Sequence, residues 1–190
     1  MTDSLVTDGD LRDAIRDHAL LEGDFVLRSG IRSRWYLDKY RFETRPEVLG
    51  PLGERLAAAV READPDATRI AAPELGAVAL AAAASLASGL PFLIVRRKPK
   101  EYGTAKRLEG VWEAGERVCL VEDVVTSGGA ALDAVEALRE AGLECRAAVC
   151  VVDREEGGVD ALARRAVRLR PLFRASDLLD AGKSAANPHR

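Results

Sequence analysis

The chain has 190 residues, 47% of them hydrophobic, which fits one folded domain and argues against disorder. Its 28 Lys and Arg and 31 Asp and Glu leave a net charge of −3, which argues against a general binder of nucleic acids or anionic membranes. We expect no signal peptide in residues 1–10, and the alanine-rich run 77–95 is too interrupted to span a membrane. Cys119, Cys145 and Cys150 show no CxxC spacing, and we interpret Cys119 and Cys150 as buried free thiols of a cytosolic protein.

The N-terminal part of the chain predicts two helices separated by an unusual segment. Thr7 is a suitable cap for a helix over residues 8–20. Residues 24–42 are too polar for a core strand and too aromatic for a plain loop. Pro46 begins the second helix, and Pro51 either kinks that helix or moves its start to a later residue.

From residue 68 onward, strand and helix patterns alternate along the chain. We expect strands at residues 68–72, 90–95, 117–122, 147–152 and near 167, helices at 76–87 and 128–141, and a helical turn at 175–179. The helix over 76–87 is apolar nearly all round, so it should be buried against a sheet or a partner subunit. The alternation predicts an α/β fold, with a parallel β-sheet flanked by helices and ligands bound at the carboxyl ends of the strands. We expect one domain over residues 1–182 and a disordered tail at 183–190.

The most informative segment is VCLVEDVVTSGGA at residues 118–130, where an apolar strand leads through two carboxylates into a turn that begins a helix. The turn offers hydroxyls and backbone N–H groups at a helix N-terminus, where an anion such as phosphate is favoured. Glu122 and Asp123 would repel a phosphate, so they should face sugar hydroxyls or a hydrated metal ion. The alternative is an ordinary turn capped by Thr126 or Ser127, and the acidic pair favours the ligand site.

This segment resembles the phosphoribosyl-pyrophosphate (PRPP) signature of the type I phosphoribosyltransferases. The resemblance implies the fold of that family, with a small N-terminal hood mainly over residues 1–45. It implies that Glu122 and Asp123 contact the ribose hydroxyls, that Asp123 also acts in catalysis, and that the turn binds the 5-phosphate. The PRPP-binding residues implied here are Glu122, Asp123, Val124, Val125, Thr126, Ser127, Gly128, Gly129 and Ala130.

Residues 25–40, FVLRSGIRSRWYLDKY, are similar to the N-terminal segment of the orotate phosphoribosyltransferases. The resemblance implies that Arg28 and Tyr36 contact the orotate ring. A cation beside an aromatic face suits orotate, which is a flat carboxylate anion. The alternative is a solvated basic loop with Trp35 or Tyr36 packed beneath it.

The charged segment RRKPKEYGTAKRLEG at residues 96–110 resembles the mobile catalytic loop of the same family. In that family the loop closes over PRPP, commonly in the site of the neighbouring subunit. The resemblance places PRPP contacts on Arg96, Arg97, Lys100 and Tyr102, with Lys100 as the main catalytic cation on the leaving pyrophosphate. The alternative for a run of charges is solvated surface.

Two further turns belong to the resemblance. Residues 72–78, APELGAV, are similar to the pyrophosphate loop, in which some members carry a lysine at the position of Gly76. Without that lysine, the loop from Arg96 must supply the cation. Arg154 stands where the family binds the orotate carboxylate, and Thr126 also belongs to the implied orotate contacts. The alternative for Arg154 is a surface ion pair with a neighbouring glutamate.

The resemblance implies an orotate phosphoribosyltransferase that converts orotate and PRPP into orotidine 5-phosphate and pyrophosphate, in the biosynthesis of UMP. It implies Mg²⁺ bound mainly through PRPP, no metal site formed by the protein, and a cytoplasmic homodimer that shares its catalytic loop and binds neither nucleic acid nor membrane. Two alternatives remain open: a phosphoribosyltransferase for a purine base, and a PRPP-sensing regulator that binds nucleic acid without turnover.

Overall fold

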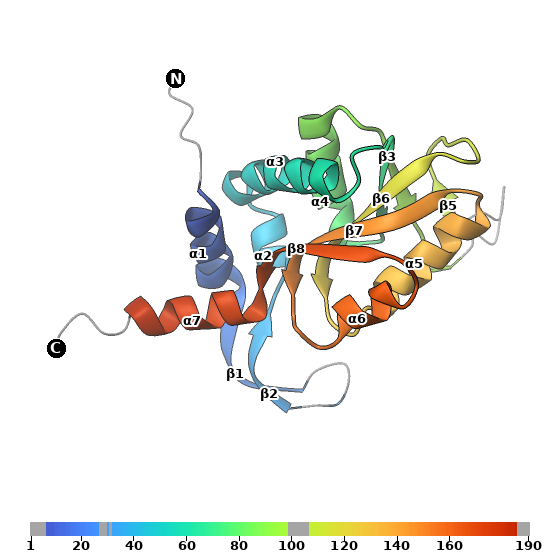
Figure 1. Cartoon of the computed structure of the whole chain (residues 1–190). Coiled ribbons are helices and arrows are strands. Elements are labelled where there is room, and N and C mark those ends of the chain that lie inside the picture. The colour runs from blue at the N-terminus through green and yellow to red at the C-terminus, as the bar shows by residue number, and fades with distance from the viewer. Residues whose placement is uncertain (1–6, 27–29, 31, 99–106, 186–190) are drawn as a thin grey trace, which may run out of the picture.

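A computed structural model of the chain describes residues 7–26, 30, 32–98 and 107–185. Its centre is a six-stranded sheet in the order β5-β4-β3-β6-β7-β8 (Figure 1). The neighbours from β4 to β8 are parallel, and the short β5 pairs antiparallel with β4. The strands are β3 Arg69–Pro73, β4 Phe92–Val95, β5 Leu108–Glu109, β6 Arg117–Val125, β7 Glu144–Asp153 and β8 Arg168–Arg174. The predicted α/β fold with a mostly parallel sheet is confirmed.

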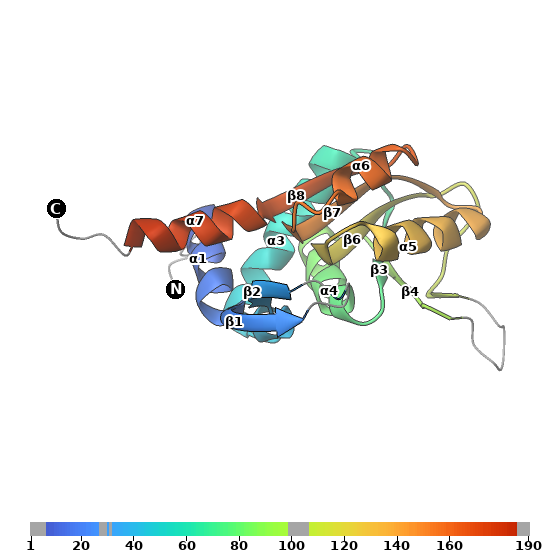
Figure 2. The ribbon, with the colours of Figure 1, turned by 90° about the horizontal axis from the view of Figure 1, so that it is seen from below.

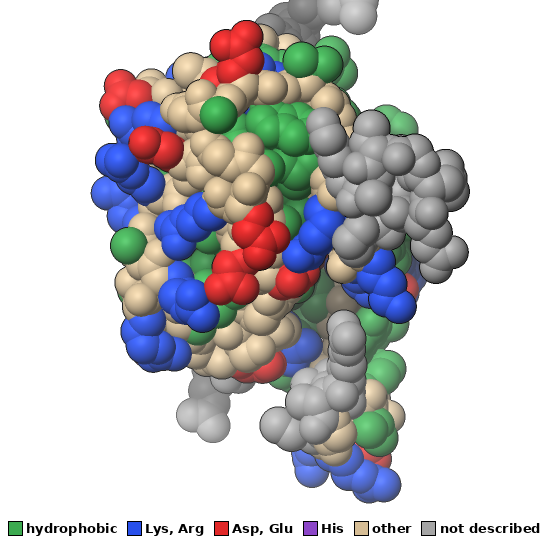
Figure 3. Space-filling view, turned by 90° about the vertical axis from the view of Figure 1, so that its right-hand side faces the viewer, with side chains coloured by type: hydrophobic (Ala, Val, Ile, Leu, Met, Phe, Trp, Pro, Cys, Tyr) green, Lys and Arg blue, Asp and Glu red, His purple; other side chains and the backbone are tan. Residues whose placement is uncertain are grey.

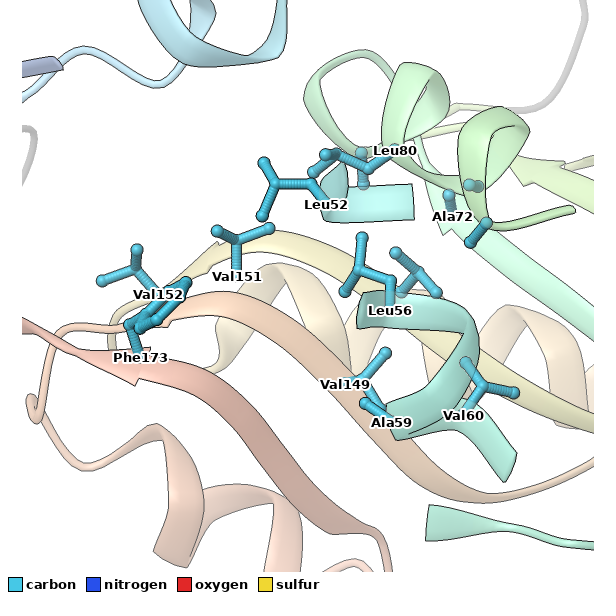
Figure 4. Packing of buried hydrophobic residues seen from close by; sticks show 14 of the residues in the cluster. Leu52, Leu56, Ala59, Val60, Ala72, Leu80, Val149, Val151, Val152 and Phe173 are labelled. Atoms are coloured by element: carbon cyan, nitrogen blue, oxygen red, sulfur yellow. The ribbon is translucent and has the colours of Figure 1, made fainter. Parts of the chain in front are cut away.

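Helices cover both faces of this sheet (Figure 2). One face packs against α3 (Pro46–Ala63) and α4 (Gly76–Ser88), and the other against α5 (Gly129–Glu140) and α6 (Gly158–Ala163). Figure 4 shows the first of these two cores, in which side chains of α3 lie over β7 and β8. The alanine-rich α4 buries only part of its surface, since Leu86 is 90% exposed.

The hood consists of a helix, a hairpin and a helical turn at one end of the sheet. These elements are α1 Asp8–Ala19, β1 Leu20–Val26, β2 Arg32–Leu37 and α2 Tyr40–Glu43. Thr7 caps α1 as predicted, because its hydroxyl accepts a hydrogen bond from the backbone N–H of Asp10 at 3.2 Å. The mixed polar and aromatic segment after residue 24 belongs to the antiparallel hairpin of β1 and β2. The last helix, α7 (Ala175–Ala185), packs against α1.

Several elements differ from the sequence predictions. β5 and α6 were missed, because two and six residues are too few to show a period. α3 begins at Pro46, so Pro51 lies inside the helix and does not move its start. β6 continues to Val125, because its last residues pair with the end of β7. α7 runs from Ala175 to Ala185 and is longer than the helical turn predicted at 175–179.

The cysteines are buried and unbonded, as the sequence predicted for Cys119 and Cys150. Burial raises the pKa of the Cys145 thiol to about 11 and shifts the pKa values of Cys119 and Cys150 upward as well. These thiols are therefore protonated and unreactive at neutral pH. Among the described residues, no helix is long and apolar enough to cross a membrane.

The close approach of α3 to α4 generates a stability prediction at Gly53. A β-carbon at Gly53 would lie 2.7, 2.8 and 2.9 Å from the Cβ, carbonyl carbon and oxygen of Ala83. We expect Gly53→Ala to lower the free energy of unfolding by about 1–3 kcal/mol, because the helix backbones must separate. Glu54→Ala, at an exposed position of the same helix, is the control and should stay within about 0.5 kcal/mol of wild type. Urea unfolding followed by circular dichroism measures both variants; a Gly53→Ala variant as stable as wild type would contradict the close approach.

Candidate functional site

A pocket of about 640 Å³ opens at the carboxyl ends of β3, β4 and β6. It brings together the turn after β6, the turn between β3 and α4, Arg96 and Arg97 after β4, and Lys39 from the hood. Another pocket, of about 520 Å³, lies along β8 and contains none of the predicted site residues. The first pocket is therefore the candidate site, in the place that a parallel sheet predicts.

The turn after β6 lines this pocket with Thr126, Ser127, Gly129 and Ala130. Gly128 precedes α5 with a φ of +83°, a conformation that favours glycine. No described side chain caps the N-terminus of α5, so its backbone N–H groups remain available for an anion. The turn rests on α6, where a β-carbon at Gly158 would overlap Val125 and the Thr126 carbonyl oxygen.

The acidic pair lies within β6, rather than beyond its end, and is almost completely buried. Glu122 is 5% exposed and Asp123 is 4% exposed. Because successive residues of a strand point to opposite faces, Asp123 faces α4 while Glu122 faces the side of α5. Burial, followed by the charge of Asp123, raises the pKa of Glu122 to about 8. Burial thus favours the protonated form of Glu122 more than water would.

Lys39 is a site residue that the sequence did not identify. Its Nζ donates a hydrogen bond to Oδ2 of Asp123 and forms an ion pair with it. Burial lowers the pKa of this ammonium, but the charge and hydrogen bond of Asp123 outweigh burial, and the net pKa is raised. The local sequence around Lys39 does not indicate that this lysine contacts a residue 84 positions away.

Gly76 makes room for this ion pair. A β-carbon at Gly76 would overlap both Nζ of Lys39 and Oδ2 of Asp123. Glu43, one helical turn after Lys39, is 2% exposed, and its Oε1 has no hydrogen-bond partner among the described residues. Burial, followed by the charge of Asp123, raises the pKa of Glu43 to about 8. Glu43 is therefore mainly neutral at pH 7, so the charge of Lys39 is directed to Asp123 and the pocket.

The two ends of the predicted catalytic loop are anchored beside the pocket. The backbone N–H of Arg97 donates to Oε1 of Glu74 at 2.9 Å, and that of Arg96 donates to the carbonyl oxygen of Arg107 at 2.7 Å. Arg96 and Arg97 both line the pocket. The predicted residues Lys100 and Tyr102 lie outside the described residues.

The predicted orotate contacts are only partly brought together. Thr126 lines the pocket, whereas Tyr36 and Arg154 do not belong to its described lining. Tyr36 is 42% exposed, with its ring centroid 5.6 Å from that of Phe25. Arg28 lies outside the described residues.

Arg154 is held at the edge of the site by two contacts. Its guanidinium carbon lies 4.3 Å from the ring centroid of Trp35, and its Nε lies 3.0 Å from Oε1 of Glu156. The side chain of Arg154 is only 9% exposed. Its backbone N–H donates to the carbonyl oxygen of Val125 at 2.8 Å, which joins the end of β7 to the end of β6. Arg154 therefore combines the predicted glutamate pair with a packed aromatic contact.

Several known proteins of similar sequence and structure are orotate phosphoribosyltransferases. The chain is 51% identical over 158 residues to an orotate phosphoribosyltransferase of Methanocella arvoryzae, which covers 83% of this chain and 88% of that protein. It is 46% identical to one of Halobacterium salinarum, over 95% of this chain and 98% of that protein. The orotate phosphoribosyltransferase of Mycobacterium tuberculosis in complex with PRPP has a TM-score of 0.76 and 28% identity, covering 90% of this chain and 98% of that one. No family model matches the chain.

The raised pKa of the buried Glu43 predicts how the stability of the protein depends on pH. The folded protein retains the Glu43 proton up to its pKa of about 8, whereas the unfolded chain loses it near 4.5. The stabilisation from this proton is complete below pH 4.5 and is lost as the pH rises toward 8. In urea unfolding between pH 5 and 9, we therefore expect Glu43→Gln to gain stability relative to wild type as the pH rises. Glu47→Gln, at an exposed position, is the control. Parallel pH profiles for wild type and Glu43→Gln would contradict the buried, protonated carboxyl group.

Proposed function

Because the chain belongs to the orotate phosphoribosyltransferase family, we propose that the pocket at the carboxyl ends of β3, β4 and β6 is its active site. The chain is a pentosyltransferase of pyrimidine biosynthesis that transfers the 5-phosphoribosyl group of PRPP to orotate. The products are orotidine 5-phosphate and pyrophosphate. One observation carries the assignment of the pocket: buried carboxyl groups and an uncapped helix N-terminus line the same cavity, as a sugar phosphate requires.

The ribose 5-phosphate part of PRPP binds to β6 and the turn that follows it. The 5-phosphate accepts hydrogen bonds from the backbone N–H groups and hydroxyls of residues 126–130. The ribose hydroxyls donate hydrogen bonds to Asp123 and Glu122, which lie on β6 shortly before the turn. The related enzyme of Mycobacterium tuberculosis, solved with PRPP, supports a PRPP site in this fold.

The diphosphate part of PRPP lies toward Arg96, Arg97, Lys100 and Tyr102. As the bond between the anomeric carbon and the diphosphate breaks, positive charge develops on the ribose and negative charge on the leaving group. Lys100 stabilises that leaving group, and Tyr102 contributes only binding, since a phenol is a poor acid at neutral pH. The anchored ends of the segment between Arg97 and Arg107 support a loop that closes over the pocket. No nucleophilic side chain is required.

Orotate binds between this loop and the hood. Arg154 supplies N–H donors to the orotate carboxylate, and its cation–π contact with Trp35 helps to hold the guanidinium in place. Thr126 contacts the base from the turn, and Tyr36 and Arg28 contact it from the hairpin.

Mg²⁺ binds mainly through PRPP. The donor set fits this ion, because Mg²⁺ is typically bound through one or two carboxylates together with substrate phosphates, and Glu122 and Asp123 line the pocket. No group of three or more His, Cys, Asp or Glu side chains in the described part of the chain could hold a metal by itself. When bound, the ion neutralises charge on the diphosphate.

The protein acts as a cytoplasmic homodimer in which each loop reaches the pocket of the neighbouring subunit. The exposed leucines Leu75 and Leu86 at the two ends of the apolar α4 support a subunit contact there. A nucleic-acid-binding regulator is disfavoured by the net charge of −3 and by the surface in Figure 3, where acidic and basic side chains lie side by side. Ion pairs such as Arg107–Asp133 and Arg165–Glu136 also join acidic and basic side chains.

An assay of base specificity tests the proposed function. Purified protein with PRPP and Mg²⁺ is offered orotate, hypoxanthine, guanine, adenine or uracil, and pyrophosphate release is measured. We expect release with orotate alone, and its loss when Mg²⁺ is omitted. Release with a purine but not with orotate would favour the purine enzyme. The absence of release with every base would favour the regulator.

A further inference from the structure

The hood contributes the side chain of Lys39 to the wall of the pocket. Lys39 directly precedes α2, and the backbone beside it is fixed because the N–H of Asp38 donates to the carbonyl oxygen of Ala19 at 2.9 Å. The side chain is 31% exposed, so its ammonium group is open to the pocket while it is paired with Asp123. The ammonium is thus presented from a fixed backbone.

This ammonium lies against the N-terminus of α4. Gly76 is the first residue of α4, and a β-carbon there would overlap Nζ. The first turn of α4 contains no acidic residue, and no described side chain caps it. The ammonium of Lys39 and the N-terminus of the 13-residue helix α4 therefore lie side by side, and together they favour the binding of a highly charged anion.

Each carboxylate oxygen of Asp123 already accepts one hydrogen bond from the protein. Its Oδ1 accepts the backbone N–H of Val124 at 2.5 Å, and its Oδ2 accepts the ammonium of Lys39. A ribose hydroxyl that donates to Oδ2 shares that oxygen with Lys39 and so weakens the hold of Asp123 on the ammonium. A diphosphate beside α4 offers the displaced ammonium new anionic oxygens.

We propose that Lys39 is a PRPP-binding residue whose ammonium moves from Asp123 to the diphosphate of PRPP and returns when pyrophosphate leaves. The proposal rests on the proposed function, because that function places PRPP in this pocket. In this proposal Lys39, from the hood of the same chain, supplies a cation beside the N-terminus of α4. The loop from Arg96 supplies further cations to the diphosphate. No bond to carbon is made or broken in this exchange.

The test compares Lys39→Met with Arg41→Met, a control at an exposed position of the same helical turn. Charge-assisted hydrogen bonds to a ligand suggest that Lys39→Met raises KM for PRPP, and for pyrophosphate in the reverse reaction, about 10- to 100-fold. KM for orotate should stay near the wild-type value, and Lys39→Arg should recover most of the loss. Calorimetric titration with Mg²⁺-pyrophosphate should show the same weakening.

The outcomes separate this proposal from the proposed function. A wild-type protein that forms orotidine 5-phosphate, with a Lys39→Met variant whose KM for PRPP and pyrophosphate affinity are unchanged, overturns the role of Lys39 alone. A wild-type protein that forms no nucleotide overturns the proposed function, and pyrophosphate binding then tests Lys39 by itself. If Lys39→Met does not fold, Lys39→Gln is measured in its place, and an unchanged pyrophosphate affinity in that variant overturns the proposal.

Discussion

Two carboxyl groups are buried at the end of β6, and their burial determines which residues can surround the pocket. A buried charge without a partner is strongly destabilising, so each group needs its own solution. Burial and the neighbouring charge raise the pKa of Glu122, which favours its protonated form. Asp123 receives an ammonium from Lys39 and a backbone N–H from Val124. The hood is thereby joined electrostatically to the central strand.

This constraint explains why small residues surround the site. Gly76 leaves space for the ion pair, and Gly158 lets α6 approach the turn that follows β6. With Gly128 in its left-handed conformation, α5 begins with its N–H groups directed to the pocket. These glycines thus allow the N-terminus of a helix to lie close to the acidic pair. The helix N-terminus suits the phosphate of a sugar phosphate, and the acidic pair suits the sugar hydroxyls.

Local patterns predicted much of the fold and part of the site. The alternation of strands and helices gave the parallel sheet, and the segment from Thr126 to Ala130 was placed correctly at a helix N-terminus. The end of β6 was predicted too early, because Glu122 and Asp123 resemble surface residues until the pairing with β7 buries them. The Lys39–Asp123 pair joins segments 84 positions apart, and no local period encodes such a contact. The ligand contacts of all the predicted site residues remain predictions, and Arg28, Lys100 and Tyr102 lie outside the described part of the chain.

The binding of PRPP to wild-type protein and to Asp123→Asn, measured by calorimetry in Mg²⁺, tests the central claim most directly. If Asp123 accepts the ribose hydroxyls, the variant should bind PRPP about 10- to 100-fold more weakly while circular dichroism shows it folded. Asp160→Asn, at an exposed position on α6, is the matched control and should bind like wild type. Equal PRPP affinity in wild type and a folded Asp123→Asn variant would contradict the account.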